Sequence, residues 1–380
     1  MNFEKVKLGD ICQIKSGKRL PKGADFAEKV TKYPYIRARD IKAGVINETD
    51  LAYLSEEVQK KLQRYIVNAG DIVITIAGTI GDVGYVKERH DGYNLTENAV
   101  RLTAFDNRIN SKYLLYVLNT KQYWDLMQQI AGGAAQPKLG IYKVESIPLE
   151  IPPIETQNRI ASILSAYEDL IENNRKQIKL LDEASRRLYK EWFVDLRFPG
   201  YGTVKIIDGV PEGWKKVFVT DLLDIKYGRD HKKLEDGNVP VYGSSGIMRY
   251  ANRKLYSGES VLIPRKGSLN NISYVDGDFW AIDTMFYSIP KMKIIAKYAY
   301  LFLSSLDMNS YNIGAAVPSM TVNILARISM LLPTEMVLRN FANAIEPLFE
   351  RMKRLNKQCR IAAEARDRLL PKLMNGEIEV

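Results

Sequence analysis

The chain has 380 residues, of which 46% are hydrophobic, so it is long enough for two or more domains with buried cores. Its net charge of +10 favours a polyanionic partner such as nucleic acid, although a basic protein without such a partner is equally compatible with this charge. Two isolated cysteines exclude a disulfide framework, and no apolar segment is long enough for a secretory signal or a bilayer span, so we expect a cytoplasmic protein.

In chain order, the sequence predicts a globular unit over residues 1–153 and a first long helix over 154–197. Within the first unit, a strand-like run over 71–76, closed by turn residues, predicts a strand, and residues 112–119 predict a short helix. Strand-like runs that alternate with short helices indicate a mixed α/β unit.

The same order follows in the second half, with a globular unit over 198–333 and a second long helix with a C-terminal tail over 334–380. Here the apolar run over 260–263 predicts a strand, and residues 297–304 predict a short helix.

The two halves are copies of each other. Residues 133–137 (GAAQP) match residues 314–318 (GAAVP) at an offset of 181, which holds without a gap over some sixty positions. At the starts of the halves, an offset of 211 relates Gly17 to Gly228. The first half carries extra residues, mostly between Lys18 and Ile66. A duplication of this kind predicts two similar units built on one scaffold.

The helices carry an apolar repeat with alternating spacings of four and three residues, which is typical of a coiled-coil seam. In the first half, the expected seam residues are Ile160, Leu164, Tyr167, Ile171, Asn174, Ile178, Leu181 and Leu188. In the second half they are Phe341, Ile345, Leu348, Met352, Leu355, Cys359, Ala362 and Leu369. Asn174 is a polar residue on this seam and is expected to fix its register. At ~1.5 Å per residue the helices would form a rod about 55–60 Å long. A helical hairpin that serves only stability is the alternative.

The motifs of catalytic centres are absent from the sequence. It contains no phosphate-binding loop, no HExxH, no GxSxG, no GxGxxG after a strand, and no Asn-Pro-Pro-aromatic tetrapeptide of the DNA amino-methyltransferases. The two histidines, His90 and His231, stand alone. We therefore predict that the chain is not an enzyme and binds neither a metal nor a cofactor.

Basic and amide side chains gather in predicted loops of both units, as contact with DNA phosphates and base edges requires. The candidates in the first unit are Lys15, Lys18, Arg19, Lys22, Arg37, Arg39, Thr79, Gln136 and Lys138. Those in the second unit are Arg229, His231, Lys232, Lys233, Ser244, Ser245, Arg265, Lys266, Asn270 and Asn271. A basic loop is more often a solvated surface, but these two sets occupy corresponding places in the repeats: Lys18 matches Arg229, and Gly78 lies near the counterpart of Gly267.

With these features, the chain resembles the DNA specificity subunit of type I restriction–modification systems. The resemblance rests on VKLGDI at residues 6–11, the helix-start segment IPLEIPPIETQ at 147–157, and LLPKLMNGEI at 369–378. The second copy of the helix-start segment, at 332–336, is degenerate and lacks the glutamine.

The resemblance implies a mixed α/β fold with two target-recognition domains that alternate with two long helices, packed as an antiparallel, pseudo-twofold coiled coil. It also implies sequence-specific binding of double-stranded DNA with a bipartite target. Two methyltransferase subunits, which use S-adenosylmethionine, and endonuclease subunits, which use ATP and Mg, would be the partners. The alternatives are a coiled-coil scaffold that binds proteins without reading DNA, and a self-sufficient nuclease or methyltransferase.

Overall fold

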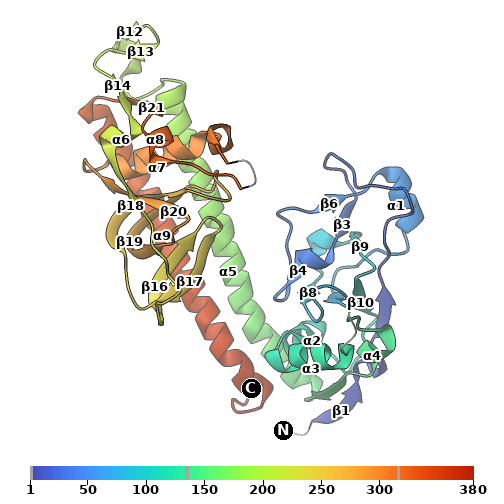
Figure 1. Cartoon of the computed structure of the whole chain (residues 1–380). Coiled ribbons are helices and arrows are strands. Elements are labelled where there is room, and N and C mark those ends of the chain that lie inside the picture. Colours follow the sequence, from blue (N-terminus) through green and yellow to red (C-terminus); the bar gives the residue numbers. More distant parts are fainter. Residues whose placement is uncertain (1–2, 133–136, 315–316) are drawn as a thin grey trace. The chain divides into compact units, whose positions relative to one another are not determined.

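The computed structural model describes residues 3–132, 137–314 and 317–380. The chain divides into unit 1, formed by residues 1–172 and 359–380, and unit 2, formed by residues 173–358. Each unit combines a globular part with segments of both long helices, α5 (Ile154–Tyr189) and α9 (Glu335–Met374). The predicted mixed α/β fold with two antiparallel long helices is confirmed (Figure 1).

The globular part of unit 1 is built on two small sheets (Figure 1). One has the strand order β2-β10-β7-β8, with bounds Gln13–Ser16, Ala99–Thr103, Ile72–Thr75 and Val83–Tyr85. The other has the order β6-β3-β9, with bounds Ala52–Tyr53, Pro34–Ile36 and Asn94–Leu95. Strands β4 (Ile41–Lys42) and β5 (Val45–Ile46) pair in the segment that the second half lacks.

Four short helices accompany these sheets: α1 (Glu56–Leu62), α2 (Ser111–Leu118), α3 (Lys121–Ala131) and α4 (Ile141–Glu145). The strand predicted over 71–76 is β7, and the helix predicted over 112–119 is α2. Strand β7 is buried along its whole length, which explains its apolar residues Ile72, Val73 and Ile74.

Unit 2 places the corresponding strands in one six-stranded sheet of order β15-β20-β18-β19-β16-β17. Their bounds are Leu223–Tyr227, Met285–Pro290, Tyr256–Pro264, Ser273–Ala281, Asp236–Gly243 and Gly246–Ala251. In unit 1, a 3₁₀ turn at Glu88–His90 separates β8 from β9. In unit 2, the continuous strand β19 takes the place of both. The helix predicted over 297–304 is α7 (Ile295–Ser305), and the strand predicted over 260–263 lies within β18.

Unit 2 also contains short elements outside this sheet. They are the hairpin of β12 (Ile206–Ile207) and β13 (Val210–Pro211), and the helices α6 (Val219–Leu222) and α8 (Val322–Leu325). A π-helical turn over Lys190–Val194 follows α5 directly.

The duplication read from the sequence is visible in the pairing of strands at the two ends of each globular part. Strand β1 (Glu4–Lys7) pairs with β11 (Pro148–Ile151), and Val6 lies opposite Leu149. Strand β14 (Lys215–Phe218) pairs with β21 (Ser329–Leu332), and Val217 lies opposite Met330. Offsets of 211 and 181 carry one pair onto the other, so both predicted offsets are confirmed.

The two long helices pack against each other within each unit. In unit 1, Ile160 and Leu164 of α5 share a core with Leu373 of α9. In unit 2, Tyr189 of α5 shares a core with Phe341 and Ile345 of α9. The first turns of α5 therefore meet the last turns of α9, and the reverse holds at the other ends, which is antiparallel packing.

Every residue expected on the seam is buried or partly buried, including Asn174, whose side chain is 3% exposed. Its Nδ2 donates a hydrogen bond of 3.3 Å to Oε1 of Gln358. Three residues further along α5, Oε1 of Gln177 accepts a hydrogen bond from Arg351 Nη2 at 3.2 Å. A polar pair at this position limits the registers in which the helices can pack.

Gln157, at the start of α5, has an internal role. Its side chain is fully buried, and its Nε2 donates to the carbonyl oxygens of Arg108 and Pro152, both at 2.8 Å. Its Oε1 accepts the backbone N–H of Asn110, the N-cap residue of α2, at 3.0 Å. The corresponding residue of the second half, Leu338, is buried in the apolar core. The missing glutamine therefore reflects a different way of packing the start of the helix.

Candidate DNA interface

The chain leaves β2 in unit 1 and β15 in unit 2 through the same backbone geometry. Gly17 N and Lys18 N donate to carbonyl oxygens in unit 1, just as Gly228 N and Arg229 N do in unit 2. In unit 1 the acceptors are Ala99 for Gly17 (3.1 Å) and Leu95 for Lys18 (2.8 Å). In unit 2 they are Met285 for Gly228 (2.9 Å) and Ala281 for Arg229 (2.9 Å). A Cβ at Gly17 would lie 2.0 Å from a carbonyl oxygen, and one at Gly228 would lie 1.9 Å from one, so only glycine fits. Lys18 and Arg229 thus occupy equivalent positions, as predicted.

A second loop is also repeated, at the ends of β7 and β18. The backbone N–H groups of Ile76 and Ala77 both donate to the carbonyl of one residue, and so do those of Arg265 and Lys266. These acceptors are Asn98 (2.8 and 3.3 Å) and Thr284 (2.8 and 3.2 Å). The next residue in each loop is a glycine with positive φ, 80° at Gly78 and 89° at Gly267. The turn that presents these loops is therefore the same in both units, while the side chains on it differ.

Most candidates of unit 1 lie on the surface around these two loops. Lys15 lies on β2 and Thr79 on the turn between β7 and β8. The exposed candidates are Lys15, Lys18, Arg19, Lys22, Thr79 and Lys138. The ammonium group of Lys18 lies 5.8 Å from the centre of the Tyr65 ring. The position of Gln136 lies outside the described residues.

Arg37 is oriented toward the protein interior. Its Nε and Nη2 form a two-pronged interaction with Asp40, each at 3.0 Å, and its side chain is 20% exposed. The hydrogen bonds with Asp40 raise the pKa of Arg37 above its usual value. Arg39 is exposed but pairs with Asp50 at 2.6 Å. The fork of Arg37 is therefore already occupied by Asp40.

In unit 2, the loop after β15 carries three exposed cations, Arg229, Lys232 and Lys233. Trp280 Nε1 donates to the carbonyl of Arg229 at 2.9 Å and thereby fixes the start of this loop. His231 is only partly exposed, and its Nδ1 is buried without a hydrogen-bond partner among the described residues. The cations point outward, whereas the histidine belongs to the base of the loop.

The β16–β17 hairpin joins the Arg265 loop. Its turn consists of Ser244 and Ser245, and Asn271 Nδ2 donates to the carbonyl of Ser244 at 2.7 Å. Asn270 Nδ2 donates to Oδ1 of Asp307 at 3.1 Å. These amides hold neighbouring loops together, which the sequence alone could not indicate. Ile247 and Met248, exposed by 49% and 55%, add an apolar surface beside the turn that composition did not reveal.

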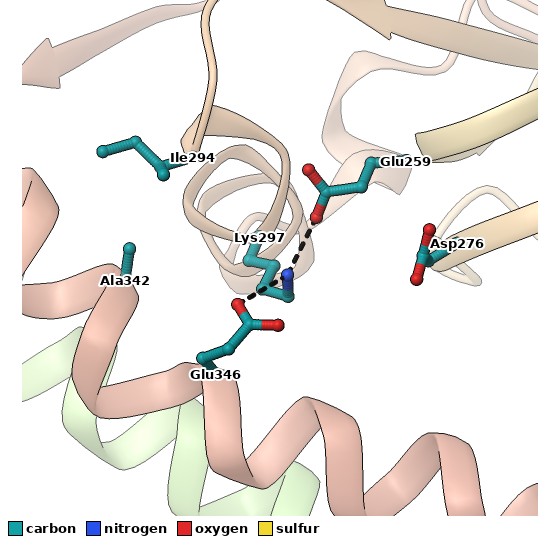
Figure 2. A pocket seen from close by; sticks show the side chains of 6 residues that line it. All are labelled: Glu259, Asp276, Ile294, Lys297, Ala342 and Glu346. Atoms are coloured by element: carbon teal, nitrogen blue, oxygen red, sulfur yellow. Dashed lines mark hydrogen bonds and ion pairs between the residues drawn. The ribbon is translucent and has the colours of Figure 1, made fainter.

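A charged hollow of about 290 Å³ lies elsewhere in unit 2, where α7 and β18 meet α9 (Figure 2). Lys297 of α7 stands between two carboxylates, with Nζ at 2.8 Å from Glu259 of β18 and 2.9 Å from Glu346 of α9. Burial would lower the pKa of Lys297, but the hydrogen bonds to both carboxylates outweigh burial and raise it. This site attaches the six-stranded sheet of unit 2 to α9.

An ion pair attaches each globular part to a long helix. In unit 1 the globular part supplies the base and the helix the acid, and in unit 2 these roles are reversed. In unit 1, Lys87 pairs with Glu172 of α5; in unit 2, Asp276 of β19 pairs with Lys353 of α9. The offset of 189 that relates Gly78 to Gly267 also relates Lys87 to Asp276, and the helix offset of 181 relates Glu172 to Lys353. The acid and the base have therefore exchanged places between the copies. The offset of 181 was readable in the sequence, whereas the offset of 189 follows from the equivalent backbone hydrogen bonds of the two loops.

Within the described residues, no three His, Cys, Asp or Glu side chains are placed to hold a metal ion. Both cysteines, Cys12 and Cys359, are free thiols. Among the helices described, none has the length and apolar character needed to cross a bilayer.

Two similar globular parts with equivalent loops define a protein with two repeated domains, and comparison with known proteins identifies its class. The family model for the type I restriction modification DNA specificity domain matches residues 1–183 and 211–355. The chain therefore belongs to the type I restriction–modification DNA specificity family. It is a specificity subunit, which recognises a DNA target within a larger complex, and such subunits are non-catalytic and carry no cofactor of their own.

Two relatives match along most of the chain. The type I restriction enzyme MjaIX specificity subunit of Methanocaldococcus jannaschii is 25% identical, over 98% of this chain and 94% of that protein. The HindI specificity subunit of Haemophilus influenzae is 20% identical, over 82% of this chain and 87% of that protein. The crystal structure of a type I system S subunit from M. genitalium has the same fold, with a TM-score of 0.60, 18% identity, and coverage of 98% of this chain and 96% of that one.

Proposed function

We propose that units 1 and 2 each read one half of a bipartite DNA target through the repeated loops. The observation that carries this proposal is the shared backbone geometry of those loops, with Lys18 equivalent to Arg229 and Gly78 to Gly267. One backbone arrangement with different side chains suits two readers that approach DNA alike and recognise different bases.

Exposed cations beside the loops supply the contacts to phosphates. These cations are Lys15, Lys18, Arg19, Lys22 and Lys138 in unit 1, and Arg229, Lys232, Lys233 and Lys266 in unit 2. Contacts of this kind position the protein on DNA and make its affinity fall steeply with salt. Thr79, Ser244, Ser245, Asn270 and Asn271 lie on the loops between these cations and supply polar groups.

The proposal extends to partners that the family resemblance implies. Two methyltransferase subunits bind the chain and methylate adenine with S-adenosylmethionine, and endonuclease subunits that use ATP and Mg complete the restriction enzyme. Helices α5 and α9 set the separation between the half-sites. The complex acts in the cytoplasm, where its DNA lies.

An exchange of recognition domains tests this function. Residues 1–153 are replaced by the corresponding domain of another specificity subunit, and the recognised sequence is determined for the complex with its methyltransferase. We expect one half of the target to change and the other half to remain. A protein-binding scaffold would show salt-insensitive partner binding and no selective DNA footprint, and that result would refute the proposal.

A further inference from the structure

We propose that Arg265 recognises a guanine in the half-site that unit 2 reads. This inference rests on the DNA-binding function proposed above and assigns one base contact within it. Arginine presents parallel N–H donors that match O6 and N7 of guanine in the major groove.

The backbone of Arg265 is held on both sides. Its N–H donates to Thr284 O at 2.8 Å, and its carbonyl accepts the N–H of Met320 at 2.9 Å. Pro264, the last residue of β18, precedes it and further restricts the chain. The starting point of the side chain is therefore fixed relative to the sheet.

The guanidinium is also oriented before any ligand binds. It lies 5.4 Å from the centre of the Tyr227 ring, and its Nη1 donates to the carbonyl of Asp283 at 3.0 Å. Tyr227 is in turn held edge-on by Phe286 at 5.1 Å between ring centres, although the tyrosine is 55% exposed. A preoriented side chain loses little conformational freedom on binding, so more of each contact contributes to discrimination.

One edge of this guanidinium remains open. Among the described residues, Nε and Nη2 of Arg265 donate to no protein acceptor. Arg37 and Arg249 differ, since the fork of Arg37 is taken by Asp40 and Nη2 of Arg249 donates to Leu234 O. The open edge lies in the loop that also carries the exposed Lys266 and Gly267.

In unit 1, the positions equivalent to Arg265 and Tyr227 hold other residue types. The repeated hydrogen bonds make Ile76 equivalent to Arg265, and Ser16, which precedes Gly17, equivalent to Tyr227. Ile76 is buried, and serine offers no ring on which a guanidinium can stack. The equivalent loop of unit 1 therefore cannot make the contact that Arg265 makes in unit 2.

The test uses the full chain in complex with its methyltransferase subunits and a randomised duplex pool, from which bound DNA is sequenced. We expect wild type to select a guanine at one position of the half-site read by unit 2. Arg265→Ala and Arg265→Lys should lose about 10- to 100-fold of the preference there and keep the other positions, because lysine retains the charge without the fork. Tyr227→Ala should cause a smaller loss at the same position.

Lys266→Ala is the matched control, which should weaken binding to all sequences without changing the selected base. Arg265→Lys keeps the test decisive should the alanine variant fail to fold. Unchanged base selection in the Arg265 variants would overturn this inference while the DNA-reading function stands. If the wild-type complex selects no sequence at all, the proposed function fails instead.

Discussion

Lys297 offers a stringent test of how the six-stranded sheet of unit 2 is attached to α9. Its side chain is 13% exposed and lies between the carboxylates of Glu259 and Glu346 (Figure 2). The ammonium group also lies 5.4 Å from the centre of the Tyr274 ring and 5.8 Å from that of Phe349. Replacing Lys297 with methionine keeps much of the side-chain volume but leaves two carboxylates facing a neutral group.

Loss of one partner from a buried ion pair costs about 3–5 kcal/mol. Here Glu259 is 33% exposed and Glu346 is 49% exposed, so water screens part of the repulsion. We therefore expect Lys297→Met to lower the free energy of unfolding by about 2–3 kcal/mol. For a unit of this size, the midpoint of thermal unfolding should fall by about 4–10 °C.

Thermal and urea unfolding of the full chain would measure this loss. Lys293→Met, at an exposed position just before the same helix, is the control and should change stability by less than about 0.5 kcal/mol. Glu346→Gln combined with Lys297→Met should restore part of the stability, because it removes one of the two facing charges. If Lys297→Met and the control gave equal losses, Lys297 would not attach the sheet to α9.

Three further predictions concern other contacts. Asp276→Lys should destabilise the chain by about 1 kcal/mol by facing Lys353, and adding Lys353→Asp should recover most of this loss in urea unfolding. Burial lowers the pKa of His90, and the nearby cations Arg89 and Lys87 lower it further, which together outweigh the hydrogen bond to Glu48. Because the folded protein disfavours the charged imidazole, stability should fall as the pH drops below about 6.5. His90→Gln should flatten this pH dependence in urea unfolding. Asn174→Leu should raise the unfolding midpoint, since a buried polar pair on the seam is replaced by apolar packing; a lowered midpoint would contradict this.

The sequence predicted the fold well where the signal is periodic or repeated. The seam spacing indicated α5 and α9, and the two offsets matched the strand registers at Val6 and Val217. Side-chain periodicity follows directly from helix geometry, and a duplication repeats its own backbone contacts. These features therefore required no knowledge of tertiary structure.

Individual side chains were harder to place because the sequence does not show which cations are already paired within the fold. The fork of Arg37 is occupied by Asp40 only three residues away, a local pairing that its basic neighbourhood obscured. Lys297 meets Glu346 because α7 packs on α9, a contact that no local pattern encodes. Burial and hydrogen bonding decide which cations remain available, and both depend on the folded structure.

Under the proposed function, one chain reads two separate half-sites. Sequencing methylated adenines in DNA from cells that carry this chain and its methyltransferase partner tests it directly. We predict a motif of two short specified parts separated by an unspecified spacer, with the two parts unlike each other. A continuous palindrome, or methylation without any motif, would show that the two units do not read separate half-sites.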